Sequence, residues 1–213
     1  MLQFPQETPS FLDQPNLKIE DRSYFSKIYP DLLFLSEPFF SSQKMFDQVI
    51  DLTQKAKEKD GIPTEAIWMG IYFEEEIRNS IHPKVSLRFI DDEVGFGIFA
   101  EQKLSPCSYV GEYTGVLLDW KKKILENKQY AMRYNIWEVG KQKFFLDAEK
   151  AGNFTRFINH SDEPNLTLQS VYCKKIPRMI FVAAKEILPG TQLTFDYGSL
   201  FWKEMSKTPK LFL

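Results

Sequence analysis

From Lys84 onward, the sequence consists of short apolar and β-branched runs separated by glycine, proline and other turn residues. Runs of this length form short strands, which cannot build a sandwich of long ones. One helix is expected among them, capped by Asp119, with Trp120, Ile124 and Leu125 on its apolar face. The pattern predicts several small sheets in an α+β fold. The expected strands are residues 85–90, 98–100, 109–118, 132–139, 143–147, 166–172 and 179–184.

The first 40 residues follow a different pattern, in which prolines are scattered among aromatic residues. Because proline interrupts helices, we expect an extended segment. Its apolar residues argue against plain disorder, so we expect this arm to lie on the domain. The prolines are Pro5, Pro9, Pro15, Pro30 and Pro38.

Two helices are expected between the arm and the β-rich region. Ser42 is a suitable cap for a helix over residues 43–59, and Gly61 is a suitable C-terminal stop. A second helix begins at residues 63–64. Its apolar residues predict the inward face, and its charged residues should stay in solvent. The expected inward residues are Ile67, Met69, Tyr72, Phe73 and Ile77.

Composition argues against several classes of protein. A formal net charge of −2 lacks the basic excess of a dedicated nucleic-acid binder and suits a basic protein partner instead. The two cysteines, Cys107 and Cys173, cannot form a disulfide framework or a zinc cluster, so we expect no metal and a reducing compartment. The sequence shows neither a cleavable secretory signal nor an apolar run long enough to span a membrane.

Two later motifs are rich in groups that bind polar ligands. Residues 156–161 read Arg-Phe-Ile-Asn-His-Ser, and residues 193–198 read Leu-Thr-Phe-Asp-Tyr-Gly. Asn159 and His160 offer directional hydrogen bonds, and Tyr197 adds a hydroxyl on an aromatic ring, so together they could hold a polar cofactor beside an apolar channel. Structural alternatives stay open, namely a buried Asn-His turn and a core tyrosine bonded to a backbone carbonyl.

Two upstream motifs complete a characteristic order. Gly95-Phe96-Gly97 lies between predicted strands, so it is a hairpin turn or a ligand-approach site, not a dinucleotide-binding fingerprint. Residues 112–115 read Glu-Tyr-Thr-Gly. With the two later motifs, this order resembles the SET-domain family of protein lysine methyltransferases over residues 84–202.

The resemblance implies a SET-domain (β-clip) fold of several small β-sheets with a C-terminal pseudoknot. It divides the chain into an N-terminal arm and helical segment (1–83), a SET catalytic domain (84–202) and a tail (203–213). The implied cofactor is S-adenosyl-L-methionine. Its implied binding residues are Gly95, Phe96, Gly97, Arg156, Asn159, His160 and Trp202, with Arg156 as a brace. The implied catalytic and channel residues are Tyr197, Tyr113, Tyr130 and Phe195, with Tyr134 as an alternative to Tyr130.

The chain departs from the commonest family pattern at Asp162, where many members have a zinc-binding cysteine. The flanking cysteines of that cluster are also absent, which implies a zinc-free member. Something else must then close the substrate channel. Phe201 and Trp202 are expected to do so, with Trp202 packing on the adenine.

The resemblance implies an S-adenosylmethionine-dependent protein-lysine N-methyltransferase acting on a histone or a bacterial histone-like protein. Phenylalanine at position 195 implies di- or trimethyl-lysine as the product, because it cannot anchor the water that a tyrosine would hold there. The chain looks like the small stand-alone bacterial SET proteins of the chlamydial type, acting in the bacterial cytoplasm or as an effector in a host nucleus. The alternative is a catalytically inactive SET module that binds a protein tail. A homodimer is left open, and neither nucleic-acid nor membrane binding is expected.

Overall fold

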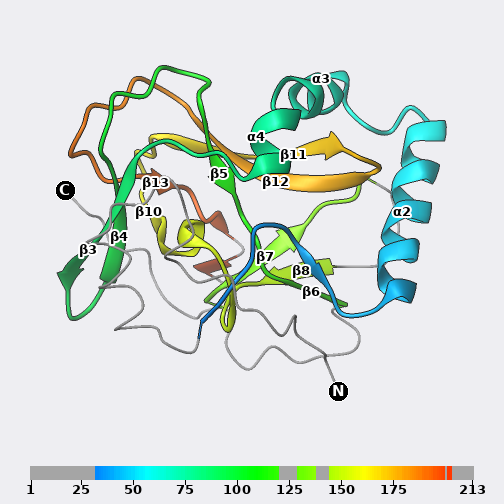
Figure 1. Ribbon diagram of the computed structural model, residues 1–213, viewed down its shortest axis with the longest axis horizontal. Helices are drawn as coiled ribbons and strands as arrows, with labels where there is room; N and C mark the ends of the chain where they lie inside the picture. The colour runs from blue at the N-terminus through cyan, green and yellow to red at the C-terminus, as the bar shows by residue number, and fades with distance from the viewer. Residues whose placement is uncertain (1–31, 120–128, 138–143, 200, 203–213) are drawn as a thin grey trace.

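Short strands in five small sheets make up most of the computed structural model, which describes residues 32–119, 129–137, 144–199 and 201–202 (Figure 1). The α+β class and the small sheets are as predicted. Two sheets are parallel pairs, β1 (Leu33–Phe34) with β9 (Ala151–Gly152) and β10 (Asn159–His160) with β13 (Thr194–Phe195). The others are the hairpin β3 (Val85–Asp91) and β4 (Gly95–Ala100), the sheet β11 (Leu166–Cys173), β12 (Ile176–Ala183) and β5 (Tyr109–Glu112), and the sheet β2 (Phe39–Phe40), β6 (Val116–Asp119), β8 (Phe144–Asp147) and β7 (Ala131–Tyr134).

Several strand bounds differ from the sequence prediction. The run expected at 109–118 is split into β5, which pairs with β12, and β6, which pairs with β8, and Gly115 lies close to β8 where the partner changes. A Cβ on Gly115 would lie 2.7 Å from the Asp147 carbonyl oxygen. Strand β7 ends at Tyr134, short of the expected end, and Trp137 has a positive φ of 59°. The helix expected after Asp119 lies outside the described residues.

The end of the predicted arm is extended and lies on the domain over residues 32–40. Strand β1 pairs with β9, and β2 pairs with the edge of β6. The Thr114 hydroxyl adds a bond of 3.0 Å to the Leu35 carbonyl. This segment therefore adds edge strands to two of the small sheets.

Helix α2 (Gln43–Glu58) begins as predicted. The Ser42 hydroxyl accepts a hydrogen bond from the Met45 amide at 3.2 Å, which satisfies one of the free N–H groups of the first turn. The stop differs in detail from the prediction, because Asp60 rather than Gly61 takes the left-handed conformation, with φ of 51°. Gly61 contributes its amide, which donates to the Ala56 carbonyl at 2.8 Å.

The second predicted helix is two helices, α3 (Thr64–Tyr72) and α4 (Glu74–Asn79), and the predicted inward face is partly wrong. Phe73 and Ile77 are buried as expected, but Tyr72 is 77% exposed. The cause is Gly70, whose missing side chain lets α3 lie directly on β11. A Cβ there would be 1.9 Å from the Tyr172 carbonyl oxygen. This contact turns Gly70 toward the sheet and Tyr72 toward solvent.

Strand β12 separates two apolar clusters. All of its residues are buried, and successive side chains point to opposite faces of the sheet. Phe181 faces the main core, which includes Tyr113 and Phe195. Val182 faces a second cluster, with Phe73 and Ile77. Helices α3 and α4 lie beside β11 and β12 (Figure 1). Within the described part of the chain, no helix has the length and apolar character needed to cross a membrane.

Candidate active site

The two polar motifs of the sequence meet in the parallel pair β10 and β13. Asn159 lies opposite Thr194, and His160 lies opposite Phe195. The Asn165 side chain locks this pairing, since its amide donates to the Gln192 carbonyl at 2.7 Å and its oxygen accepts from the Thr194 amide at 2.9 Å. Segments more than 30 residues apart in sequence thus form one site.

The glycine motif joins the same site through Asn159. The Asn159 amide group donates to the Phe96 carbonyl at 3.0 Å. A Cβ on Gly97 would lie 3.1 Å from the Asn159 side-chain nitrogen and 2.8 Å from that of Gln192. Gly95 has a φ of +77° at the start of β4, so it also serves the hairpin. The absence of a side chain at position 97 lets Asn159 approach this strand.

His160 is buried and bonded at both ring nitrogens. Its Nδ1 accepts the Tyr197 backbone N–H at 3.2 Å, and its Nε2 lies 3.1 Å from Asp162 Oδ1. A backbone N–H can only donate, so Nδ1 must carry the lone pair. The neutral ring therefore carries its hydrogen on Nε2 and donates it to Asp162.

Two buried tyrosine hydroxyls point to backbone carbonyls. Tyr197 donates to the Ile158 carbonyl at 2.9 Å, and Tyr113 donates to the Tyr130 carbonyl at 2.7 Å. Burial raises the pKa of both phenols above the ordinary value, so both stay protonated. A hydroxyl that donates keeps its oxygen lone pairs, so each can still accept a hydrogen bond from a ligand.

Other aromatic rings lie around the ring of Tyr197. The Phe195 ring lies 4.8 Å from that of Tyr197 and 4.9 Å from that of Phe181, measured between centroids. The Trp202 ring stacks on Tyr197 at 6.1 Å with an interplanar angle of 14° and meets His160 edge-on at 4.9 Å. These rings form an apolar wall beside the hydrogen-bonded residues.

Arg156 is bonded to two backbone carbonyls and lies against the Tyr130 ring. Its Nε donates to the Ala148 carbonyl at 2.7 Å, and Nη2 donates to the Glu149 carbonyl at 3.2 Å. Its guanidinium lies 3.9 Å from the centre of the Tyr130 ring. Tyr130 lies beside Tyr113, whose hydroxyl donates to its carbonyl. The buried Tyr134 instead donates through its hydroxyl to the Pro177 carbonyl at 2.5 Å. Of the two candidates left open by the sequence, Tyr130 is the one beside Tyr113 and Arg156.

The comparison with known families agrees with this geometry. The family model described as the SET domain matches residues 95–198, the span that contains the glycine motif, β10, β13 and Tyr197. Residues 95–198 therefore resemble a SET domain. Trp202 lies outside the matched span.

Each relative matches part of this chain and a small part of its own length. The Homo sapiens histone-lysine N-methyltransferase EHMT1 is 31% identical over 131 residues, which cover 59% of this chain and 10% of that protein. The Homo sapiens histone-lysine N-methyltransferase SETD2 is 35% identical over 111 residues, which cover 51% of this chain and 4% of that protein. The chain thus spans a tenth or less of the length of these two curated relatives.

Solved structures support the SET fold. A humanized mutant of the Chaetomium thermophilum Polycomb Repressive Complex 2 superposes with a TM-score of 0.51 at 26% identity, covering 57% of this chain and 16% of that chain. The predicted fold class is therefore confirmed. The roles of the individual site residues stay predictions.

The residues of the SET site suit an adenosine-bearing cofactor such as S-adenosylmethionine. The Trp202 indole N–H is buried and has no hydrogen-bond partner within the described structure, so it can donate to a ligand. Asn159 and His160 add backbone and side-chain polar groups, and Gly95 has open space where a Cβ would lie. Trp202 also offers a ring face for packing on an adenine, as the resemblance implies.

Metal ligands do not gather around this site. Among the described residues, no group of three or more His, Cys, Asp or Glu side chains could hold an ion. Cys107 is exposed, whereas Cys173 is buried in the second apolar cluster. The absence of zinc stays a prediction for the protein as a whole.

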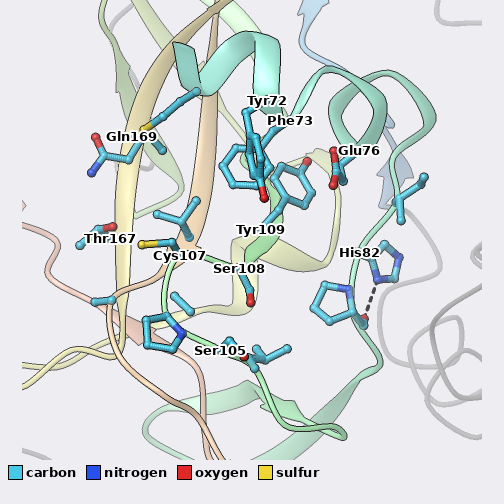
Figure 2. A pocket seen from close by; sticks show the side chains of 18 of the residues that line it. Tyr72, Phe73, Glu76, His82, Ser105, Cys107, Ser108, Tyr109, Thr167 and Gln169 are labelled. Carbon is cyan, nitrogen blue, oxygen red and sulfur yellow. Dashed lines mark hydrogen bonds between the residues drawn. The ribbon is translucent and has the colours of Figure 1, made fainter. Parts of the chain in front are cut away.

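A separate groove lies beneath α3 and α4, on the β12 face opposite Phe181 (Figure 2). Tyr72, Phe73 and Tyr109 form its aromatic side, and Cys107 and Ser108 also line it. None of the predicted site residues lines it. The groove is thus distinct from the SET site.

Sequence reasoning missed partners within the site. They include the carbonyls of Ile158 and Gln192 and the side chain of Asp162. No sequence signal marks a backbone carbonyl as an acceptor. For Asp162, the spacing of two residues from His160 was a usable signal, because neighbours at this distance on an extended segment share one side.

Proposed function

We propose that this chain is an S-adenosylmethionine-dependent protein-lysine N-methyltransferase. One observation carries the proposal: the protonated hydroxyls of Tyr113 and Tyr197 adjoin an aromatic wall beside the Asn159-His160 and glycine motifs. This joins a polar cofactor site to an apolar channel. The SET match and the histone-lysine methyltransferase relatives support the same activity.

The cofactor supplies an activated methyl group when bound. Asn159, His160 and the glycine strand would hold its polar portions, and Trp202 would exclude water from one side. The rings of Tyr113, Tyr130 and Phe195 would hold the aliphatic stem of lysine. Alignment of the amine with the methyl accounts for much of the rate, since such positioning can contribute ~7–11 kcal/mol.

The lysine amine must be neutral, because an ammonium has no lone pair to attack with. Removal from water lowers the pKa of an amine, so an apolar channel favours the neutral form. The Tyr197 oxygen keeps lone pairs after donating to Ile158, so it can accept an N–H bond and orient the amine. Weak CH···O contacts from the same oxygens can steer the methyl group.

Transfer of a radiolabelled methyl group from S-adenosylmethionine to purified histones and bacterial basic proteins tests the activity. We expect label on a lysine of at least one histone or histone-like protein. A Tyr197→Phe variant in parallel shows whether the label depends on this site. Binding of S-adenosylhomocysteine without transfer to any basic protein would favour the non-catalytic module that binds a protein tail.

Several finer features belong to the proposal. A histone substrate is supported by the relatives, which are histone-lysine methyltransferases of animals and a plant. Di- or trimethyl-lysine as the product is supported by Phe195. The relationship to the small chlamydial-type SET proteins rests on the sequence resemblance alone. So does the proposed action in a bacterial cytoplasm or a host nucleus. The absence of nucleic-acid and membrane binding rests on the net charge of −2 and on the lack of a long apolar run, and a homodimer stays open.

A further inference from the structure

We propose that Asp162 is a positioning residue that fixes the tautomer of His160 and, through it, the backbone of Tyr197. The inference rests on the proposed function for its catalytic consequence, but not for its structural part. It concerns the position at which this chain departs from the commonest SET pattern. The link runs Asp162 to His160 to Tyr197, through hydrogen bonds of 3.1 and 3.2 Å.

The link depends on which ring nitrogen carries hydrogen. With hydrogen on Nε2, His160 donates to Asp162 and keeps the Nδ1 lone pair for the Tyr197 amide. With hydrogen on Nδ1, two donors would face each other at 3.2 Å, and Asp162 would face a second lone pair. Because the His160 ring is buried, each ring nitrogen that faces the wrong kind of group costs a hydrogen bond. The Asp162 carboxylate, which only accepts, therefore favours the same tautomer as the Tyr197 amide and adds to its preference.

A second carboxylate, Asp196, also lies near the ring but cannot replace Asp162. Its Oδ1 is 3.6 Å from His160 Nδ1, too far for a hydrogen bond. The same oxygen already accepts the Gly198 amide at 2.8 Å. Moreover, it faces the nitrogen that must stay unprotonated. Asp162 is thus the carboxylate that selects the Nε2–H form.

The tautomer matters because one short segment, residues 158–160, binds both the backbone N–H and the hydroxyl of Tyr197. The amide is bonded to His160, and the hydroxyl is bonded to the Ile158 carbonyl, two residues earlier. Without the hydrogen bond from the Tyr197 backbone N–H to His160, only the hydroxyl and ring contacts would set the position of Tyr197. A looser Tyr197 would hold its oxygen less accurately, which lowers turnover more than substrate binding.

The tautomer can be read directly by long-range ¹H–¹⁵N correlation spectra of the histidine rings. The chain has two histidines, His82 and His160, so a His82→Gln variant assigns the signals. We expect His160 in the Nε2–H form in the unmodified protein and in Asp162→Asn, whose side-chain oxygen still accepts. We expect a shift toward the Nδ1–H form, or a mixture, in Asp162→Ala. An Nδ1–H form in the unmodified protein, or an unchanged spectrum in Asp162→Ala, would overturn the proposal.

Kinetics of peptide methylation test the consequence. We expect Asp162→Ala to lower kcat roughly tenfold with little change in KM, as for the loss of one buried hydrogen bond, and Asp162→Asn to restore most of it. Glu163→Ala, which removes a neighbouring exposed carboxylate, is the matched control and should behave as the unmodified protein. The Asp162 side chain is 52% exposed, so folding should survive its replacement.

The two measurements separate this proposal from the proposed function. If the unmodified protein methylates nothing, the proposed function fails, and the spectra still decide whether Asp162 sets the tautomer. If methylation occurs but Asp162→Ala and Glu163→Ala give the same kcat as the unmodified protein, the positioning role is overturned. Equal losses in Asp162→Ala and Asp162→Asn would also overturn it, because charge rather than hydrogen-bond acceptance would then matter.

Discussion

Two polar clusters in this protein, one buried throughout and one around the buried His160, differ in how completely their hydrogen-bonding groups are paired. In one, Glu112 of β5 and Arg178 of β12 face each other through parallel bonds of 2.5 and 2.6 Å. Burial alone would lower the pKa of Arg178, but the charge and hydrogen bonds of Glu112 raise it above the ordinary value. In the other, His160 links Asp162 to Tyr197, and the tyrosine oxygen retains lone pairs.

The difference shows that burial of charged or polar groups does not by itself mark a functional site. The Glu112 carboxylate and the Arg178 guanidinium pair with each other inside one sheet, which fits a structural role. Tyr113, Tyr197 and Trp202 instead keep unused hydrogen-bonding capacity beside aromatic rings. A ligand can bind to such unpaired hydrogen-bonding groups where water is largely excluded.

The largest expected effect comes from breaking the Glu112–Arg178 pair. Arg178→Met should lower the free energy of unfolding by about 3–5 kcal/mol, because it leaves a buried carboxylate without its partner. Replacing both residues, by Glu112→Leu with Arg178→Met, should recover much of the loss. Urea unfolding measures each variant.

The exposed pair Lys103 and Glu186 provides the control. Its nitrogen and oxygen are also close, at 2.7 Å, but both side chains are more than half exposed. Lys103→Met should therefore change the free energy of unfolding by less than ~1 kcal/mol. Equal effects at Lys103 and Arg178 would contradict a structural role for the buried pair.

The second effect is catalytic and falls on Tyr197. Tyr197→Phe should reduce single-turnover methyl transfer on the order of a hundredfold, because a preorganised polar group at the reacting atoms is lost. Affinity for S-adenosylhomocysteine should change little. Tyr134→Phe is the matched control, since it also removes a buried hydroxyl bonded to a carbonyl, but away from the site. Near-normal transfer by folded Tyr197→Phe would reduce Tyr197 to a core residue.

A smaller effect is expected on cofactor binding. Asn159→Ala and His160→Ala should each weaken S-adenosylhomocysteine binding by ~1–3 kcal/mol, because a buried partner loses its hydrogen bond. Titration calorimetry on folded variants measures the change. Asn135→Ala, at an exposed turn, should bind as the unmodified protein does. Unchanged affinity in both site variants would remove these residues from the cofactor site.

Local features of the fold could be predicted from the sequence because their causes are local. The Ser42 hydroxyl caps α2 through a neighbour three residues away, and the longer strands carry their own periodicity. The orientation of α3 could not be predicted in this way. Gly70 decides it by packing on Tyr172, about 100 residues later in the chain, while Trp68 and Tyr72 look as apolar as an inward face.

The site itself could be predicted from the sequence only through its motifs. Strands β10 and β13 have two residues each, too few for any periodicity, and Asn165 fixes their pairing over more than 25 residues. The resemblance brought Asn159, His160 and Tyr197 together without this information. It did not reveal the His160 to Asp162 bond, because the family pattern assigns a different residue type and role to that position.

The smallest expected change in chemistry, one added hydroxyl, falls on Phe195 and affects only the product. The ring is 5% exposed and lies between Phe181 and Tyr197, so a hydroxyl added here would need a water or polar partner. A held water would take the space that a methylated amine needs in order to rotate. We therefore expect di- or trimethyl-lysine from the unmodified protein and a shift toward monomethyl-lysine in Phe195→Tyr, with the first transfer retained. Mass spectrometry of a histone peptide over time measures this, and Phe89→Tyr, at a ring 47% exposed, should leave the product unchanged. Accumulation of monomethyl-lysine alone by the unmodified protein would show that Phe195 does not set the product.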